Sequence, residues 1–204
     1  TRYLPVRSTA RTLTVRNSGP LSFLKLPGGV PTATLVAEAR REELGDFRFI
    51  TGGFEGGAYG RSQTAKALYG EAVFPLFGEG GFAPGFRLLE LRVAARAEWY
   101  RQTGSNQPPE ERVEFKTRLR SLDPTLSARW KPIDSLMFRA SWGTGFLPPQ
   151  LSQIANSPAF VQPTLFVQDP LRGGEFLSNV TFTTEANTEL KPEQSKNLSF
   201  GAVV

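Results

Sequence analysis

The sequence predicts an all-β protein whose strands run antiparallel, and three observations support this prediction. Apolar and polar residues alternate almost without interruption along residues 88–101. Residues 122–147 show the same alternation on both sides of a polar turn at 131–134. Because successive side chains of a strand point to opposite faces, each segment has one apolar and one largely polar face. Short and long connections also alternate along the chain, which extends the prediction from a sheet to a barrel.

The segment 88–101 carries the clearest strand pattern. Its apolar face consists of Leu89, Leu91, Val93, Ala95, Ala97 and Trp99. The opposite face carries Glu90, Arg92, Arg96, Glu98 and Tyr100. About ten residues tilted by about 45° cross a membrane as a β-strand, and an apolar face that ends in Trp suits a membrane interface. A soluble β-sandwich or a lipocalin-like barrel would alternate in the same way, so both remain alternatives.

The same pattern predicts strands at 10–23, 33–43, 63–75, 88–101, 113–130, 136–145 and 195–204. Tight turns occupy the shorter connections, at 26–29, 77–81 and 131–134. The other connections are mostly longer, at 44–62, 102–112 and 146–194. Short turns at one rim and long loops at the other are the plan of an outer-membrane β-barrel, with periplasmic turns and extracellular loops.

Two positions depart from a simple strand pattern. Residues 33–44 contain many good helix formers. The alternation of Leu35, Ala37 and Ala39 and the preceding Pro-Gly-Gly turn nevertheless favour a strand. Pro124 lies inside a strand pattern and removes a ladder donor, so we expect a bulge or a local break there.

Composition argues against catalysis, metal binding and nucleic-acid binding. The chain has no Cys and no His, which excludes disulfides, thiolate or imidazole ligands and a Ser-His-Asp triad. We therefore expect no enzyme activity, no metal and no cofactor. The net charge of +5 is scattered rather than collected in a stripe, so no nucleic-acid partner is expected. Residues 78–83 match the G-x-G-x-x-G/A dinucleotide pattern, but Pro84-Gly85 follows where a helix should begin, which favours a turn.

Four segments resemble the barrel region of TonB-dependent outer-membrane receptors. Trp142-Gly143-Thr144-Gly145-Phe146 is similar to a segment that recurs in these barrels, and residues 187–195 resemble the segment that precedes a late barrel strand. Residues 26–29 and 60–71 are also similar, and the four segments occur in the same order. The resemblance spans most of the chain.

This resemblance implies a barrel of about twenty-two strands, of which seven form only a part. Residues 1–204 are then expected to be a partial barrel domain that lacks the plug domain and the TonB box. The implied function is uptake of a siderophore, a cobalamin or an oligosaccharide across the outer membrane of a Gram-negative bacterium. The implied partners are outer-membrane lipid, the receptor's own plug, TonB and a small-molecule substrate. A soluble or surface-attached all-β ligand-binding domain is the alternative function.

The polar strand faces and the longest loop supply the candidates for substrate contact. In lipid, charges such as those of Arg96 and Glu98 are tolerated only toward a watery lumen or other protein. Binding residues also concentrate on loops that a rigid scaffold holds, which points to 146–194. The candidates are Arg96, Glu98, Tyr100, Arg139, Phe146, Gln150, Phe160 and Phe166.

Overall fold

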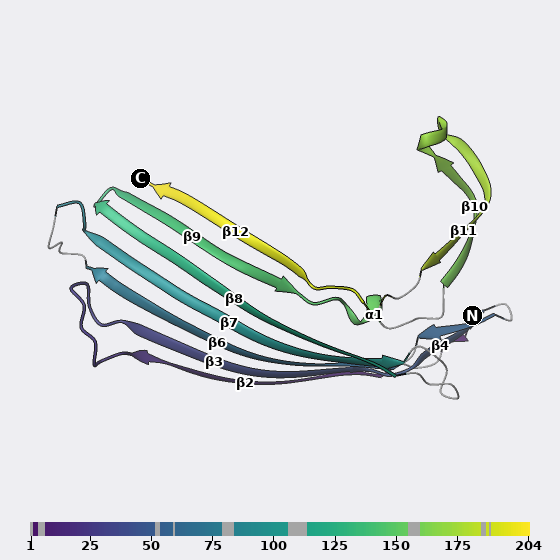
Figure 1. Ribbon diagram of the computed structural model, residues 1–204, viewed down its shortest axis with the longest axis horizontal. Coiled ribbons are helices and arrows are strands. Elements are labelled where there is room, and N and C mark those ends of the chain that lie inside the picture. Colours follow the sequence, from purple (N-terminus) through teal and green to yellow (C-terminus); the bar gives the residue numbers. More distant parts are fainter. Residues whose placement is uncertain are drawn as a thin grey trace.

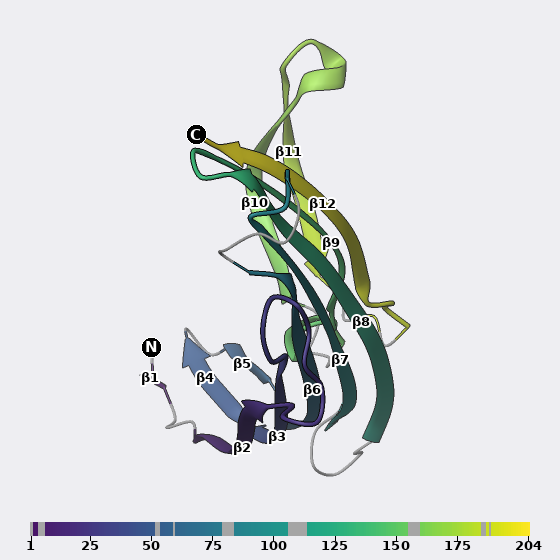
Figure 2. The ribbon, with the colours of Figure 1, turned by 90° about the vertical axis from the view of Figure 1, so that its left-hand side faces the viewer.

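The computed structural model describes residues 2–3, 7–51, 54–58, 60–78, 84–105, 114–154, 160–184, 187 and 189–204. Its main feature is one seven-stranded antiparallel sheet, ordered β12-β9-β8-β7-β6-β3-β2. These strands are β2 (Ser8–Pro20), β3 (Thr32–Leu44), β6 (Arg61–Phe77), β7 (Leu88–Ser105), β8 (Glu114–Ile133), β9 (Leu136–Leu147) and β12 (Glu193–Val203). Each predicted strand corresponds to one of the seven, so the predicted all-β antiparallel class is confirmed. Figure 1 shows them side by side in one layer, and Figure 2 shows that the layer is curved.

β3 is a strand, as its alternation predicted and against its helix propensity. It pairs along its whole length with β2 on one side and with β6 on the other. Helix propensities of ordinary residues differ by at most about 0.7 kcal/mol per residue. Two complete ladders satisfy the backbone groups of β3 on both sides, and this pairing outweighs the local preference.

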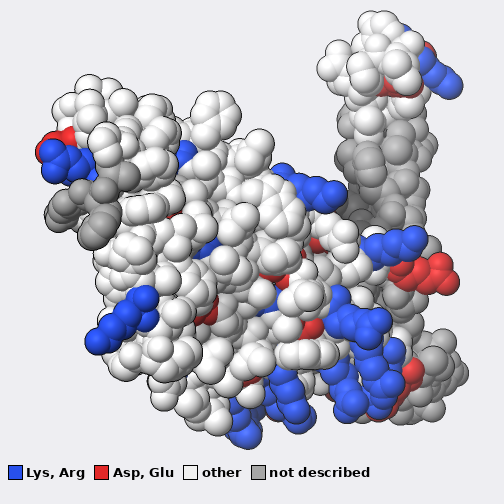
Figure 3. Space-filling view, turned by 60° about the vertical axis from the view of Figure 1, so that its left-hand side comes forward, with Lys and Arg blue, Asp and Glu red and all other residues white. Residues whose placement is uncertain are grey.

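The apolar residues of the sheet share its convex face. Directly paired residues of antiparallel strands lie on the same face. The register therefore places in one row the residues Ala72, Val93, Leu126, Trp142 and Leu198. Val93 is 48% exposed and Leu126 is 49% exposed. These side chains are not buried between two sheets, so the sandwich alternative is wrong. Figure 3 views this side, where the surface is mostly uncharged.

Aromatic rings mark the edge of the apolar face at the short-turn rim. Phe86 lies 5.2 Å from Phe77 and 6.0 Å from Trp130, and Trp130 lies 5.5 Å from Phe138, measured between ring centroids. Trp99 lies ten residues along β7 from Leu89, toward the other rim. A rise of about 3.3 Å per residue at a tilt of about 40° gives this band a height of about 25 Å. That height matches the lipid-facing band of a membrane barrel.

The short turns lie together at one rim. Residues 134–135 alone join β8 to β9. In the turn between β2 and β3, Gly28 donates its backbone N–H to the Pro75 carbonyl oxygen at 3.1 Å. A Cβ on Gly28 would lie 2.5 Å from that same oxygen, so the close approach of the two backbones requires glycine.

Two of the longer connections, at 44–62 and 146–194, contain secondary structure that the sequence did not predict. β4 (Phe47–Thr51) and β5 (Phe54–Ala58) join β1 (Arg2–Tyr3) in a small sheet ordered β1-β4-β5. Between β9 and β12 lie α1 (Leu151–Ile154), β10 (Phe160–Asp169), the 3-10 turn η1 (Pro170–Arg172) and β11 (Glu175–Thr184). β10 and β11 pair only with each other. A local hairpin satisfies its own backbone groups without joining the main sheet.

The bulge expected at Pro124 is also absent from the β7–β8 ladder, in which Pro124 stands opposite Ala95 without a register shift. The break lies in the β8–β9 ladder instead, whose pairing ends one residue later with Thr125 opposite Gly143. A missing donor is tolerated where a strand loses its neighbour. Among the described residues, no helix is long and apolar enough to cross a membrane.

Candidate functional site on the concave face

Charged side chains on the concave face form ion pairs that link several strands. Arg96 Nε on β7 lies 2.7 Å from Glu98 Oε1, and Arg96 Nη2 lies 3.9 Å from Glu38 Oε2 on β3. Arg92 Nη1 lies 3.9 Å from Glu71 Oε2 on β6. The pairs therefore connect β3, β6 and β7 across the inside of the curve.

Further pairs extend this set along the same face. Tyr69 donates its hydroxyl proton to Glu71 Oε2 at 2.5 Å. Toward the short-turn rim, Arg129 Nη2 on β8 lies 3.1 Å from Glu90 Oε2 on β7. The side chain of Glu98 is only 12% exposed, and that of Glu90 is 22% exposed. Partly buried opposite charges attract more strongly than charges in bulk water, so these pairs make a polar wall whose charges largely cancel.

A second cluster lies on the concave face near the long-connection rim. The ring of Tyr100 stacks on that of Phe146, with 5.9 Å between centroids. Gln102 is 0% exposed. Its Nε2 donates to Gln63 Oε1 at 2.7 Å and to the Pro149 carbonyl oxygen at 2.9 Å. These bonds fasten the segment that follows β9 onto the inner side of β6 and β7.

The segment after β9 packs closely against this cluster. Pro149 is buried, and Ile154 at the end of α1 is only 1% exposed. Gln153 contributes its carbonyl oxygen as acceptor for the backbone N–H of Asn187, at 2.8 Å. That bond joins the outgoing and returning parts of the connection at its base. The β10–β11 hairpin extends from this closed base (Figure 1).

The structure brings four of the eight predicted contact residues together. Arg96, Glu98 and Tyr100 follow one another on the concave face of β7, and Phe146 stacks on Tyr100. In this group Arg96 and Glu98 neutralise each other.

The other four predicted residues lie elsewhere. Arg139 is on the same face but toward the short-turn rim, in a shallow hollow of about 550 Å³ that Glu90, Ser141 and Ser199 also line. Gln150 begins the turn of α1, where its backbone N–H donates to Gln153 Oε1 at 2.8 Å. Phe160 and Phe166 occupy positions on β10, opposite Thr184 and Ser178, and their side chains are outside the described set.

Sequence reasoning missed the buried amide cluster of Gln63 and Gln102. No local pattern in the sequence predicts this cluster, because Gln63 and Pro149 are both far from Gln102 along the chain. It also missed a group of cations on the convex face. The alternation of Lys116, Arg118 and Arg120 on one face of β8 is a signal that could have found that group.

Among the residues that the structure describes, no group of three or more carboxylate, thiol or imidazole side chains could hold a metal ion. A family model described as TonB dependent receptor-like, beta-barrel, matches residues 7–204. Comparisons with curated proteins and with solved structures each found no match.

Proposed function

The chain belongs to the family of TonB-dependent receptor-like β-barrels, and from this we propose that it forms part of the barrel wall of a receptor for a scarce nutrient. The family consists of outer-membrane transporters of Gram-negative bacteria that work with TonB, and it is a family of transporters rather than enzymes. The finer proposal is that the substrate is a siderophore, a cobalamin or an oligosaccharide. We further propose that residues 1–204 are one part of the barrel domain of a complete receptor.

The contrast between the two faces of the sheet carries this proposal. The convex face presents a band of exposed apolar side chains about 25 Å high, bounded by the aromatic group of Phe77, Phe86 and Trp130. The concave face presents paired charges and buried amides. A wall with lipid on one side and a watery lumen with a plug on the other needs this division.

Within that proposal the wall shapes the path and performs no chemistry. The ion-paired surface around Arg96 offers polar contacts to the plug without a large net charge. TonB-driven rearrangement of the plug then opens a path along this surface. We propose that Tyr100 and Phe146, near the long-connection rim, contact the substrate as it enters.

Growth of a strain that lacks the receptor gene tests the proposal. The strain is grown with limiting iron, with limiting cobalamin or with oligosaccharides as the carbon source, and the complete receptor is restored from a plasmid. We expect restoration to rescue growth on one nutrient class, and a deletion of TonB to cancel that rescue. Rescue that persists without TonB, or no rescue on any class, would contradict the proposal.

Substitution at the rim tests the contact residues separately. Tyr100→Ala should weaken uptake because it removes the ring that stacks on Phe146. Ser141→Ala is the matched control, since Ser141 lies on the same face but bonds Ser199 toward the other rim. Equal uptake by the two variants, at equal amounts of assembled receptor, would place substrate contact elsewhere.

A further inference from the structure

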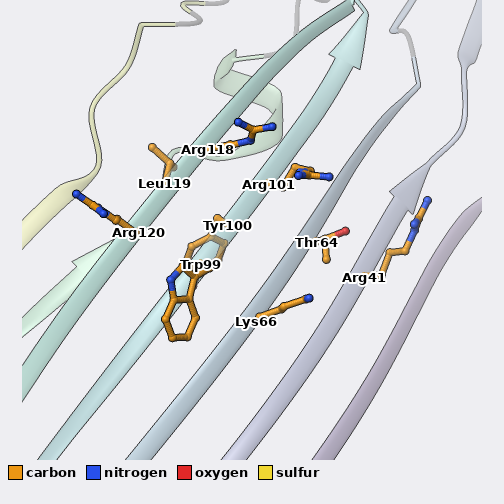
Figure 4. A pocket seen from close by; sticks show the side chains of 9 residues that line it. All are labelled: Arg41, Thr64, Lys66, Trp99, Tyr100, Arg101, Arg118, Leu119 and Arg120. Carbon is orange, nitrogen blue, oxygen red and sulfur yellow. The ribbon is translucent and has the colours of Figure 1, made fainter.

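A shallow hollow of about 730 Å³ lies on the convex face near the long-connection rim. The strand register sets its walls, because Lys66, Trp99 and Arg120 stand opposite one another on β6, β7 and β8. Arg101 and Arg118 stand opposite each other in the next row toward the rim. Figure 4 shows these side chains gathered over the same three strands. Five cations line the hollow. Arg41 on β3 forms an ion pair with Glu43, and the other four share a patch that is two rows deep.

Within the described part of the chain, no carboxylate forms an ion pair with Lys66, Arg101, Arg118 or Arg120. Like charges that stand directly opposite each other in a sheet, as Arg101 and Arg118 do, are destabilising. By contrast, the concave arginines of β7 and β8 all have carboxylate partners. Among the described residues, the convex patch thus lacks the carboxylate partners that the concave arginines of β7 and β8 have.

The patch lies directly at the edge of the apolar band. The next row toward the middle of the band is apolar, with Leu68, Ala97 and Leu122 in register. Leu68 is 50% exposed and Leu122 is 68% exposed. Trp99 stands at the boundary, where amphipathic rings favour the membrane interface. An anion bound by the patch would therefore lie directly beside surface suited to an acyl chain.

We propose that this convex patch binds the phosphorylated head group of a membrane lipid in the leaflet that the long connections face. The cations contact the phosphate oxygens, and the acyl chains lie along Leu68 and Leu122. Cationic clusters at the membrane surface attract anionic lipid head groups, each basic residue adding to the affinity. The adjoining apolar row favours a lipid over a free anion. This inference rests on the proposed function, because it takes the apolar band as lipid-facing.

Lipid retention by the complete receptor, purified in a neutral detergent, tests the site. The probes are lipid A with its phosphates, the same lipid after enzymatic dephosphorylation, and inorganic phosphate, with bound lipid counted by native mass spectrometry. The test variant is Arg118→Gln/Arg120→Gln, which removes two convex cations. The matched control is Lys25→Gln/Arg87→Gln, which removes two cations near the short-turn rim. Arg118→Lys/Arg120→Lys keeps the charge at both positions. The comparison of phosphorylated with dephosphorylated lipid on the wild type still tests the site if the glutamine pair fails to assemble.

We expect phosphorylated lipid A to bind the wild type and the control equally, and the glutamine variant at least tenfold more weakly. The lysine variant should bind within a few-fold of the wild type. The inference is overturned if the dephosphorylated lipid is retained equally well, or if an assembled glutamine variant retains phosphorylated lipid A within a few-fold of the wild type. It is also overturned if the lysine variant loses binding tenfold, or if millimolar phosphate displaces the lipid completely. Growth rescue by the wild type without lipid retention would leave the proposed function standing and reject this site alone. Lipid retention without growth rescue would leave this lipid site standing and contradict the proposed nutrient uptake.

Discussion

A cation at Val93 would test the assignment of the two faces most directly. Val93 lies near the middle of the apolar band of β7, and its cross-strand neighbours in the same row are Ala72 and Leu126. No neighbour in that row can pair with an arginine. An arginine on the lipid face near mid-membrane costs about 2–4 kcal/mol, which is about 30- to 700-fold in the folding equilibrium constant.

The assay is the fraction of folded barrel, read from heat-modifiable gel mobility of the complete receptor in outer-membrane fractions. Val36→Arg is the matched control, because it makes the same substitution on the concave face of β3. Val36 stands opposite Tyr69, whose hydroxyl bonds Glu71, and opposite Arg16. An arginine there therefore meets a carboxylate as well as a like charge, on a polar face that accepts a cation. We expect Val93→Arg to reduce the folded fraction strongly and Val36→Arg to leave most of it.

The opposite pattern would refute the reasoning. If Val93→Arg folds like the wild type while Val36→Arg does not, the convex face is the watery one and the lipid assignment is inverted. If both variants fold normally, neither face contacts lipid at this depth.

The remaining predictions concern the concave face and the long connection. Arg139→Leu should reduce uptake more than assembly, because this exposed lumen-side cation has no ion-pair partner among the described residues; uptake and gel mobility are measured on the same cells. Gln102→Leu should release the segment 148–154, since two buried acceptors lose their donor at about 1–3 kcal/mol each, and faster cleavage of this segment by protease would show it. Replacing residues 160–184 with a short Gly-Ser linker should leave assembly intact, because this hairpin pairs only with itself and Gln153 bonds Asn187 at its base. We expect substrate binding at the cell surface to be lost, and wild-type binding by the replaced receptor would assign recognition to other parts.

The strands were predictable because a period of two is local information. The alternation from Leu89 to Trp99 identified both the strand and its apolar face, and neighbouring segments did the same. Even β3 followed this rule against its helix propensity. Candidate residues close together on one strand, such as Arg96 and Tyr100, were placed correctly relative to each other for the same reason.

Contacts between distant segments could not be predicted from the sequence. The buried bonds of Gln102 join β7 to β6 and to the segment after β9, and no local pattern indicates such partners. The strands inside the long connections were missed because short pairings depend on which segments meet. The position of the break beside Pro124 likewise depended on where the neighbouring strand ends.

The sequence by itself determined that this protein is a set of antiparallel amphipathic strands with one apolar and one polar face each, because side-chain direction in a strand depends only on residue parity. Its family resemblance pointed to the same barrel. Only the tertiary structure decided which charges meet. Register brings Arg96 on β7 to Glu38 on β3 across the one intervening strand, β6, on the concave face. It also leaves Lys66, Arg101, Arg118 and Arg120 together without a described carboxylate partner on the convex face. Whether a charge is neutralised or left to attract a ligand depends on distances between strands, and these exist only once the chain has paired.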